Sequence, residues 1–217
     1  MRYPQGVGVA AAVAAGFVLD RCEAVPALIG KPEDFLIVTG LAGTARDIAA
    51  LTHDSAQIYT MAGAMGGAVM IGLGLALARP EKRVLVATGD GEILMNVGAL
   101  ATVAITNPAN FSILVVDNGH YGETGWQKSH TSLGVDLEKI ASGSGIRRAQ
   151  TISTEAELAD GARSCVRATV PRLSCSASRR PSRPPTSAIS TPPRAAIASA
   201  RRCWAPFNNS SFQFRLR

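Results

Sequence analysis

The chain has 217 residues, of which 47% are hydrophobic and 21 are glycine, a composition that suits a packed domain and excludes fibrous and membrane-embedded proteins. Its charge is uneven. Residues 1–170 hold all 16 acidic residues together with 13 Lys and Arg, whereas residues 171–217 hold nine Arg and no Lys, Asp or Glu. The body of the chain therefore has a formal charge of −3 and the C-terminal segment of +9, which together give the formal net charge of +6.

The first 30 residues predict a helical extension ahead of the main domain. Residues 6–19 are rich in Ala, Val and Gly, which faintly imitates a secretory signal. Their hydrophobicity is weak, and Arg21-Cys22-Glu23 is a poor cleavage context, so we favour an N-terminal helix or an extension from a misplaced start codon. The four cysteines, at positions 22, 165, 175 and 203, lack CxxC spacing, and we expect free thiols in a reducing, cytoplasmic compartment.

Between residues 31 and 170, strand-like and helix-like segments alternate. The strands are expected at 35–38, 57–60, 83–88, 111–116 and 147–152. The intervening helices are expected at 44–51, 66–79, 92–106, 135–142 and 154–168. A final edge strand should begin near Val170. This order predicts one doubly wound α/β domain over residues 31–170, with a mainly parallel sheet and helices on both faces.

Residues 171–217 form an Arg/Pro/Ser-rich segment without helical or strand periodicity, for which we expect a disordered basic tail. Arginine without lysine is what a GC-rich gene gives when it is read out of frame, so one hypothesis is that the native frame is lost near residues 169–173. The alternative is a nucleic-acid-binding tail. It is disfavoured by the missing lysines and by the scarcity of aromatic residues other than Trp204 and Phe207.

The most informative feature is Gly89-Asp90-Gly91, followed by Asn118 after a second apolar run. A strand–helix–strand unit is right-handed and parallel, so both strands end at the same edge of the sheet. Asp90 and Asn118 should therefore emerge side by side where open α/β sheets bind ligands. Oxygen ligands beside a glycine-lined helix start suit Mg²⁺ holding a diphosphate. The competing interpretation is that both segments are ordinary turns.

This spacing resembles the diphosphate-anchoring motif of thiamine-diphosphate (ThDP) enzymes. The resemblance implies that Asp90, Asn118 and the backbone carbonyl of His120 ligate Mg²⁺, and that Gly89, Gly91 and Glu92 lie at the cofactor. The family often has Asn-Asn where this chain has Asp117-Asn118. The first member of that pair is not an expected ligand.

Residues 61–67, which follow the strand at 57–60, resemble the turn that holds the aminopyrimidine ring in ThDP decarboxylases. By this resemblance the carbonyl of Gly63 accepts a hydrogen bond from the 4′-amino group. Met65 is the apolar side chain that bends the cofactor, and Ala64 lies between them. Orientation of the cofactor would be the main catalytic task of Gly63 and Met65. The alternative is that Met65 is ordinary core filler.

The loop at 119–131 resembles sulfopyruvate and phosphonopyruvate decarboxylases in particular. It implies that Tyr121 and Gly122 line the cofactor site and that the substrate is a small anionic 2-oxo acid. His120, Gln127, Lys128 and His130 are candidates to face that substrate, and Glu123 is a further candidate carboxylate. We expect His130 and Glu123 to be surface residues.

ThDP enzymes of this family also need a glutamate from a separate pyrimidine-binding domain, and no glutamate of this chain has that context. The resemblance therefore implies a β-subunit-like chain, inactive alone, that needs a pyrimidine-domain subunit and a second copy of itself. Two other interpretations are open. One is a carboligase or oxidoreductase subunit, for which the cysteine spacing argues against an iron–sulfur type. The other is a non-catalytic or decayed cofactor-binding fragment.

Overall fold

A six-stranded parallel sheet forms the centre of the protein. The computed structural model describes residues 19–53, 55–61, 63–166 and 170–174, and the predictions for residues 1–18 and 175–217 lie outside this part. The strand order is β2-β1-β3-β4-β8-β7, and every neighbouring pair is parallel. The strands are β1 (Phe35–Thr39), β2 (Ile58–Thr60), β3 (Arg83–Gly89), β4 (Phe111–Asp117), β7 (Ala149–Ile152) and β8 (Val170–Ser174). The predicted parallel α/β fold is confirmed.

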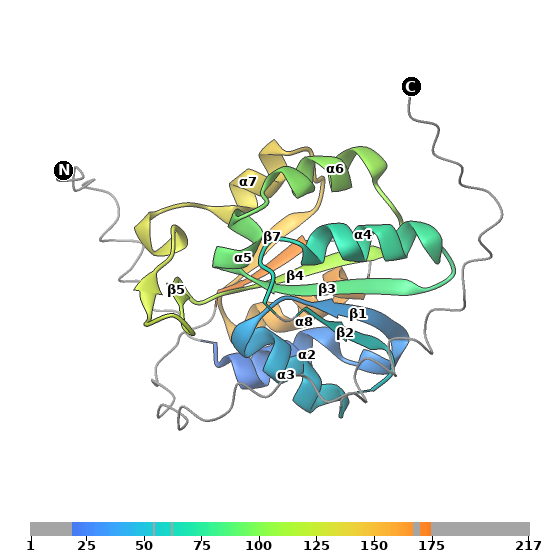
Figure 1. The fold of residues 1–217 in the computed structure, drawn as a ribbon, viewed down its shortest axis with the longest axis horizontal. Coiled ribbons are helices and arrows are strands. Elements are labelled where there is room, and N and C mark those ends of the chain that lie inside the picture. Colours follow the sequence, from blue (N-terminus) through green and yellow to red (C-terminus); the bar gives the residue numbers. More distant parts are fainter. Residues whose placement is uncertain (1–18, 54, 62, 167–169, 175–217) are drawn as a thin grey trace.

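Helices cover both faces of this sheet (Figure 1). One face carries α4 (Ala68–Ala78), α6 (Gly98–Thr106) and α7 (Leu137–Gly143). The opposite face carries α2 (Arg21–Ile29), α3 (Ala42–Thr52) and α8 (Glu155–Val166). Among the described residues no helix is both long enough and apolar enough to cross a membrane.

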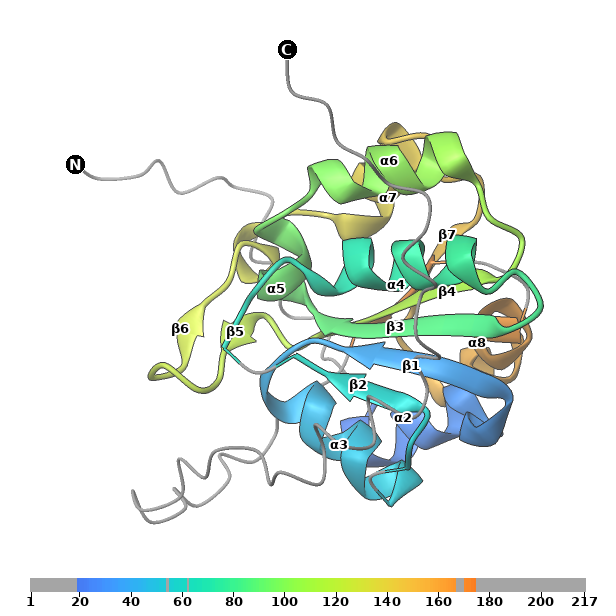
Figure 2. The same ribbon diagram turned by 45° about the vertical axis from the view of Figure 1, so that its right-hand side comes forward.

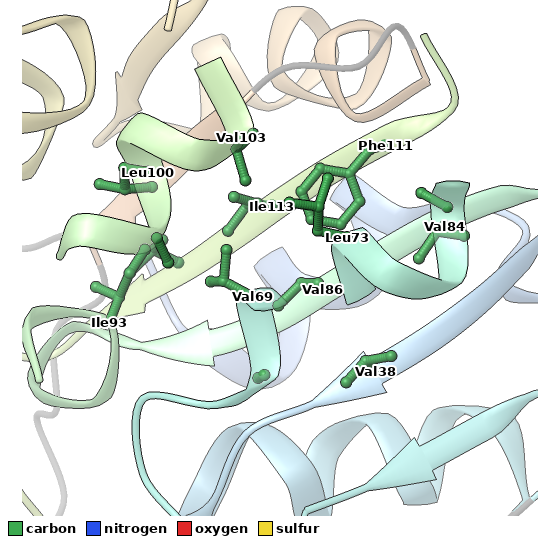
Figure 3. Close-up of a cluster of buried hydrophobic side chains, with 14 of the residues drawn as sticks. Val38, Val69, Leu73, Val84, Val86, Ile93, Leu100, Val103, Phe111 and Ile113 are labelled. Atoms are coloured by element: carbon green, nitrogen blue, oxygen red, sulfur yellow. The ribbon is translucent and has the colours of Figure 1, made fainter. Parts of the chain in front are cut away.

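The central strands supply both hydrophobic cores because successive side chains of a strand point to opposite faces. Val84 and Val86 of β3 pack in the core beneath α4 and α6, which Figure 3 shows around Phe111 and Leu73. Leu85, between the two valines, packs in the other core. Full burial of such a side chain contributes about 1.5–3 kcal/mol each, so the two-sided apolar runs of β3 and β4 stabilise the layers on both faces.

The helix expected at 92–106 is interrupted, so that prediction of one continuous helix was wrong. A short helix, α5 (Asp90–Leu94), directly follows β3, and α6 begins at Gly98 after a turn. In that turn the side-chain amide of Asn96 donates to the carbonyl of Gly66 at 3.0 Å. This long-range contact fixes the turn against the segment that precedes α4.

The strand expected near Val170 is present, but its expected position at the sheet edge was wrong. β8 lies between β4 and β7, and β2 and β7 are the edge strands of the described sheet. The chain places β7 outermost first and then returns through α8 to fill the gap beside β4. The sheet therefore extends to residue 174, four residues into the range that the sequence pattern separates from the domain.

Helix α2 belongs to the packed domain although it lies within the first 30 residues. Val25 and Leu28 are buried in the same core as β1, β3 and β4. Asp20 begins the helix as its N-cap, accepting from the amide of Cys22. The helix ends at Ile29, before Gly30 with φ +67°.

A small antiparallel hairpin, β5 (His120–Tyr121) and β6 (Gln127–Lys128), projects beyond the end of β4. Two short 3₁₀ segments, Pro32–Asp34 and Thr131–Leu133, complete the described elements. Figure 2 shows the hairpin and α5 at the same end of the sheet. That end is formed by the carboxyl ends of the strands, where ligands bind in open α/β sheets.

Candidate functional site

Two acidic residues meet where β3 and β4 end. Gly89 pairs in register with Val116, so Asp90 and Asp117 follow at the same level of adjacent strands. Asp90 opens α5 and is 3% exposed, whereas Asp117 is the last residue of β4 and is fully buried. The topology thus brings two carboxyl groups together at the sheet edge.

Hydroxyl groups from the loop after β6 hold these carboxyl groups. Thr131 Oγ1 lies 2.6 Å from Asp117 Oδ1 and 3.1 Å from Asp90 Oδ2, and Ser129 Oγ also donates to Asp90 Oδ2. Burial, and next the nearby Asp117 carboxyl group, raise the pKa of Asp90 above its usual range, while the two hydroxyls oppose the rise. Ser129 and Thr131 were not predicted as site residues from the sequence. Their signal was two small hydroxyl residues just after a glycine-rich loop.

Asn118 follows Asp117 in a tight turn, so the turn interpretation of this segment describes its backbone correctly. Asn118 Oδ1 accepts from the amide of His120 at 2.9 Å, and Gly119 donates to Asp117 Oδ1 at 3.0 Å. Gly119 has φ +67°, which a glycine adopts at no steric cost. The side chain of Asn118 is half-buried at the end of β4, beside β3, the strand that Asp90 directly follows.

The two residues after Asp90 contact different segments: Gly91 lies against the hairpin, and Glu92 lies against the turn after β1. An added Cβ at Gly91 would lie 2.2 Å from the ring of Tyr121, so the glycine permits the hairpin to pack on α5. Glu92 is 4% exposed and accepts from the amide of Leu41 at 3.0 Å, just after β1 ends. Gly91 and Glu92 therefore tie the start of α5 to the hairpin and to the end of β1, while Gly122 is exposed in the hairpin.

The segment from Gly63 to Met65 lies in an exposed loop between β2 and α4. Gly63 has φ +84°, and no atom lies within 4 Å of its would-be Cβ. Met65 is 39% exposed, so the alternative of ordinary core filler is wrong. An exposed methionine in a glycine-flanked loop is open to contact a ligand or another chain.

The hairpin places its polar residues at the surface. The ring of His120 stacks on that of Trp126 with centroids 5.4 Å apart, and its Nδ1 lies 2.9 Å from the Asn118 carbonyl oxygen. Glu123 is exposed and pairs with Arg46 of α3 at 2.8 Å, as expected for a surface carboxylate. The remaining candidates, Gln127, Lys128 and His130, are also exposed.

Within the described residues, no three or more His, Cys, Asp and Glu side chains cluster in an arrangement that could hold a metal ion. The predicted ligand set includes one such side chain, Asp90, beside an amide and a backbone carbonyl. This predicted set of ligands, with one carboxylate and two neutral oxygens, therefore differs from a metal site built of three titratable side chains.

Comparisons with known proteins identify relatives of this chain. The family model described as "Thiamine pyrophosphate enzyme, C-terminal TPP binding domain" matches residues 41–173. The sulfopyruvate decarboxylase subunit beta of Methanocaldococcus jannaschii is 48% identical over 102 residues, which are 47% of this chain and 52% of that protein. The phosphonopyruvate decarboxylase of Streptomyces viridochromogenes is 38% identical over 141 residues, which are 64% of this chain and 35% of that protein. This chain thus spans about half of the first relative and about a third of the second.

Among solved structures, the benzoylformate decarboxylase of Polynucleobacter necessarius superposes with a TM-score of 0.60 at 17% identity. The superposition covers 73% of this chain and 33% of that one, and it concerns the fold alone. The family model, by contrast, spans the residues from the turn after β1 into β8, which include Asp90 and Asn118. The chain belongs to the family of thiamine pyrophosphate enzymes, and it carries their C-terminal TPP-binding domain.

Proposed function

We propose that this chain is the ThDP- and Mg²⁺-binding subunit of a non-oxidative 2-oxo-acid decarboxylase. The observation that carries the proposal is Asp90, a buried carboxyl group in a Gly-Asp-Gly segment at the start of α5, at the carboxyl edge of a parallel sheet. The names of the two relatives favour a short 2-oxo acid bearing a sulfonate or phosphonate group as substrate.

The donor chemistry at this edge fits a magnesium ion. Asp90 and Asp117 are buried together, and the pKa of Asp90 is raised by burial and by its neighbour's charge. A divalent cation would offset both effects. Asp90, the amide oxygen of Asn118 and the carbonyl oxygen of His120 would supply hard oxygen ligands, which Mg²⁺ prefers.

The remaining site residues would hold the organic part of the cofactor. Gly63, Ala64 and Met65 are proposed to orient the aminopyrimidine ring from their exposed loop. The diphosphate end is proposed to lie among the residues around α5 and the hairpin, namely Gly89, Gly91, Glu92, Tyr121 and Gly122. Bound ThDP supplies the electron sink that decarboxylation of a 2-oxo acid requires. The residues of this chain bind and orient it.

A partner chain would complete the active site. One relative is named as a subunit beta, which supports assembly with a different subunit. We propose that this subunit provides the glutamate that contacts the pyrimidine ring, and that two copies of each chain assemble in the cytoplasm. Met65 of the cofactor loop and Met95 of the α5–α6 turn are both exposed, which supports a surface that another chain covers.

Thermal unfolding tests the cofactor claim, because a ligand that binds the folded state raises the unfolding midpoint. Wild-type protein should show a higher midpoint with ThDP plus Mg²⁺ than with either alone, and Asp90→Asn should abolish that increase. Asp34→Asn is the matched control, since Asp34 pairs at the surface with Arg83. An unchanged increase in Asp90→Asn would overturn the assignment of Asp90, and no increase in wild type would overturn the proposed function.

A further inference from the structure

Glu92 lies buried between the ends of β1 and β3. Its side chain is 4% exposed, and Oε2 accepts from the amide of Leu41 at 3.0 Å. Gly40, the residue before Leu41, provides the space: an added Cβ there would lie 1.6 Å from Oε2. The carboxyl group of α5 thus fills a gap that exists because β1 is followed by a glycine.

The turn that Glu92 holds is strained. Leu41 is the N-cap of α3 and makes no side-chain capping hydrogen bond, and Ala42 has φ +67°. A non-glycine residue in the left-handed region is strained and persists where surrounding contacts enforce it. The hydrogen bond from Leu41 to Glu92 is such a contact, and it comes from a residue 51 positions away in the chain.

The contact between Glu92 and Leu41 lies at the carboxyl ends of β1 and β3, which are neighbouring strands. Helix α3, which follows β1, covers one face of the sheet, while α5 and α6, which follow β3, lie toward the other (Figure 2). The helices that follow β1 and β3 therefore lie on opposite faces of the sheet, so the boundary between these two strands is the topological switch point. In open α/β sheets, ligands bind in the crevice at this switch point, outside the carboxyl ends of the strands.

The second oxygen of Glu92 supports a role beyond structure. Oε1 is buried, and no hydrogen-bond partner for it exists among the described residues. A buried polar atom without a partner is costly to keep, and a hydrophobic residue or a shorter polar one would avoid that cost. At the ligand crevice, Glu92 therefore carries a cost in stability that a residue serving packing alone would not.

We propose that Glu92 is a positioning residue that joins the β1–α3 turn to α5, so that the two sides of the switch-point crevice are held as one unit for the cofactor. This inference rests on the proposed function. In this inference Glu92 maintains the shape of the turn at 40–42, and that turn forms one wall of the proposed cofactor site.

Two substitutions separate the side-chain hydrogen bond from the charge. Glu92→Gln keeps an oxygen that can accept from Leu41, whereas Glu92→Ala removes the acceptor. We expect Glu92→Ala to weaken ThDP binding with Mg²⁺ by about tenfold, the loss of one hydrogen bond to a carboxyl group, and Glu92→Gln to stay within about twofold of wild type. Isothermal titration calorimetry measures both affinities.

Hydrogen exchange on the cofactor-free protein gives an independent readout. Amides 41–44 should exchange faster in Glu92→Ala than in wild type or Glu92→Gln. Glu157→Ala is the matched control, because Glu157 Oε2 also accepts from backbone amides at a helix start, those of Ser153 and Thr154, but beside the edge strand β7. It should leave both ThDP affinity and the exchange of residues 41–44 unchanged.

The outcomes distinguish this inference from the proposed function. If wild type binds ThDP and Glu92→Ala binds it equally well, or if Glu92→Gln is impaired as much as Glu92→Ala, the positioning role is overturned. If wild type binds no ThDP while amides 41–44 depend on Glu92, the proposed function is overturned and the structural contact stands. Gly40→Ala, which displaces the Glu92 side chain without removing it, should reproduce the Glu92→Ala result.

Discussion

The hydroxyl group of Thr131 lies between the carboxyl groups of Asp90 and Asp117, within 3.1 Å and 2.6 Å of one oxygen of each. Two buried acidic groups at the ends of neighbouring strands repel each other, and a bridging donor reduces that repulsion. The loop after the hairpin is thereby tied to both strands. This contact makes the edge of the sheet a single polar unit rather than two separate turns.

Thr131→Val should destabilise the cofactor-free protein. The substitution keeps the shape of the side chain but leaves both carboxyl groups without this donor, a loss of about 1–3 kcal/mol. Thr131→Ser, which retains the hydroxyl, should recover most of it. Urea unfolding measures the difference, and Thr124→Val, which removes an exposed hydroxyl hydrogen-bonded to Gln127, is the control. Equal stability of Thr131→Val and wild type would show that the bridge is energetically neutral.

Two glycines of α4 should respond in opposite directions to alanine. A Cβ at Gly72 would lie 2.2 Å from Val86 Cγ2, so Gly72→Ala should lower stability by about 1–3 kcal/mol through overpacking. No atom lies within 4 Å of the corresponding position at Gly74, so Gly74→Ala should raise stability by about 0.5–1 kcal/mol through helix propensity. Chemical denaturation of the isolated chain tests the pair, and a common sign for both would contradict this packing of α4 on β3.

Glu157 should make the start of α8 sensitive to acid. The hydrogen bond from the amide of Ser153 lowers the pKa of Glu157 below its ordinary value of 4.5. Hydrogen bonds from the amide and the hydroxyl of Thr154 lower this pKa further. A lowered pKa in the folded state adds stability above pH 4.5 that is lost as the pH falls through the folded-state pKa. Glu157→Gln should therefore flatten the stability profile in that window. Urea midpoints measured across this pH window test the prediction. An equal loss of stability with falling pH in wild type and Glu157→Gln would refute it.

The isolated chain should release no CO₂ from any 2-oxo acid, because the glutamate that contacts the pyrimidine ring is expected on another polypeptide. Co-expression with the product of a neighbouring gene that encodes a pyrimidine-domain subunit should restore the reaction. Coupled assays with sulfopyruvate and phosphonopyruvate would detect it. Turnover by the single chain would contradict a requirement for a partner.

The sequence predicted the central strands well because β3 and β4 are apolar on both faces and are bounded by clear turn residues. It failed where distant contacts decide the structure. The break at Asn96 depends on a hydrogen bond to Gly66, 30 residues away, which no local pattern records. The position of β8 between β4 and β7 depends on the order in which strands fill the sheet, and an apolar segment near Val170 carries no information about that order.

At the site, the spacing of Asp90 and Asn118 predicted the correct edge of the sheet but not its contacts. Asp117, which was not an expected ligand, is the carboxyl group that shares a donor with Asp90. Glu92 was identified as a site residue from its place in the motif. Its contact with Leu41 could not be predicted, because it joins segments 51 residues apart.

Manganese binding measured by electron paramagnetic resonance tests the central claim most directly, since Mn²⁺ accepts the same oxygen ligands as Mg²⁺ and its free signal disappears on binding. Wild-type protein should take up one Mn²⁺ per chain in the presence of ThDP, and both Asp90→Asn and Asn118→Ala should lose this uptake while Asp34→Asn keeps it. Undiminished ThDP-dependent uptake by Asp90→Asn would show that the ion is held elsewhere and would contradict the account.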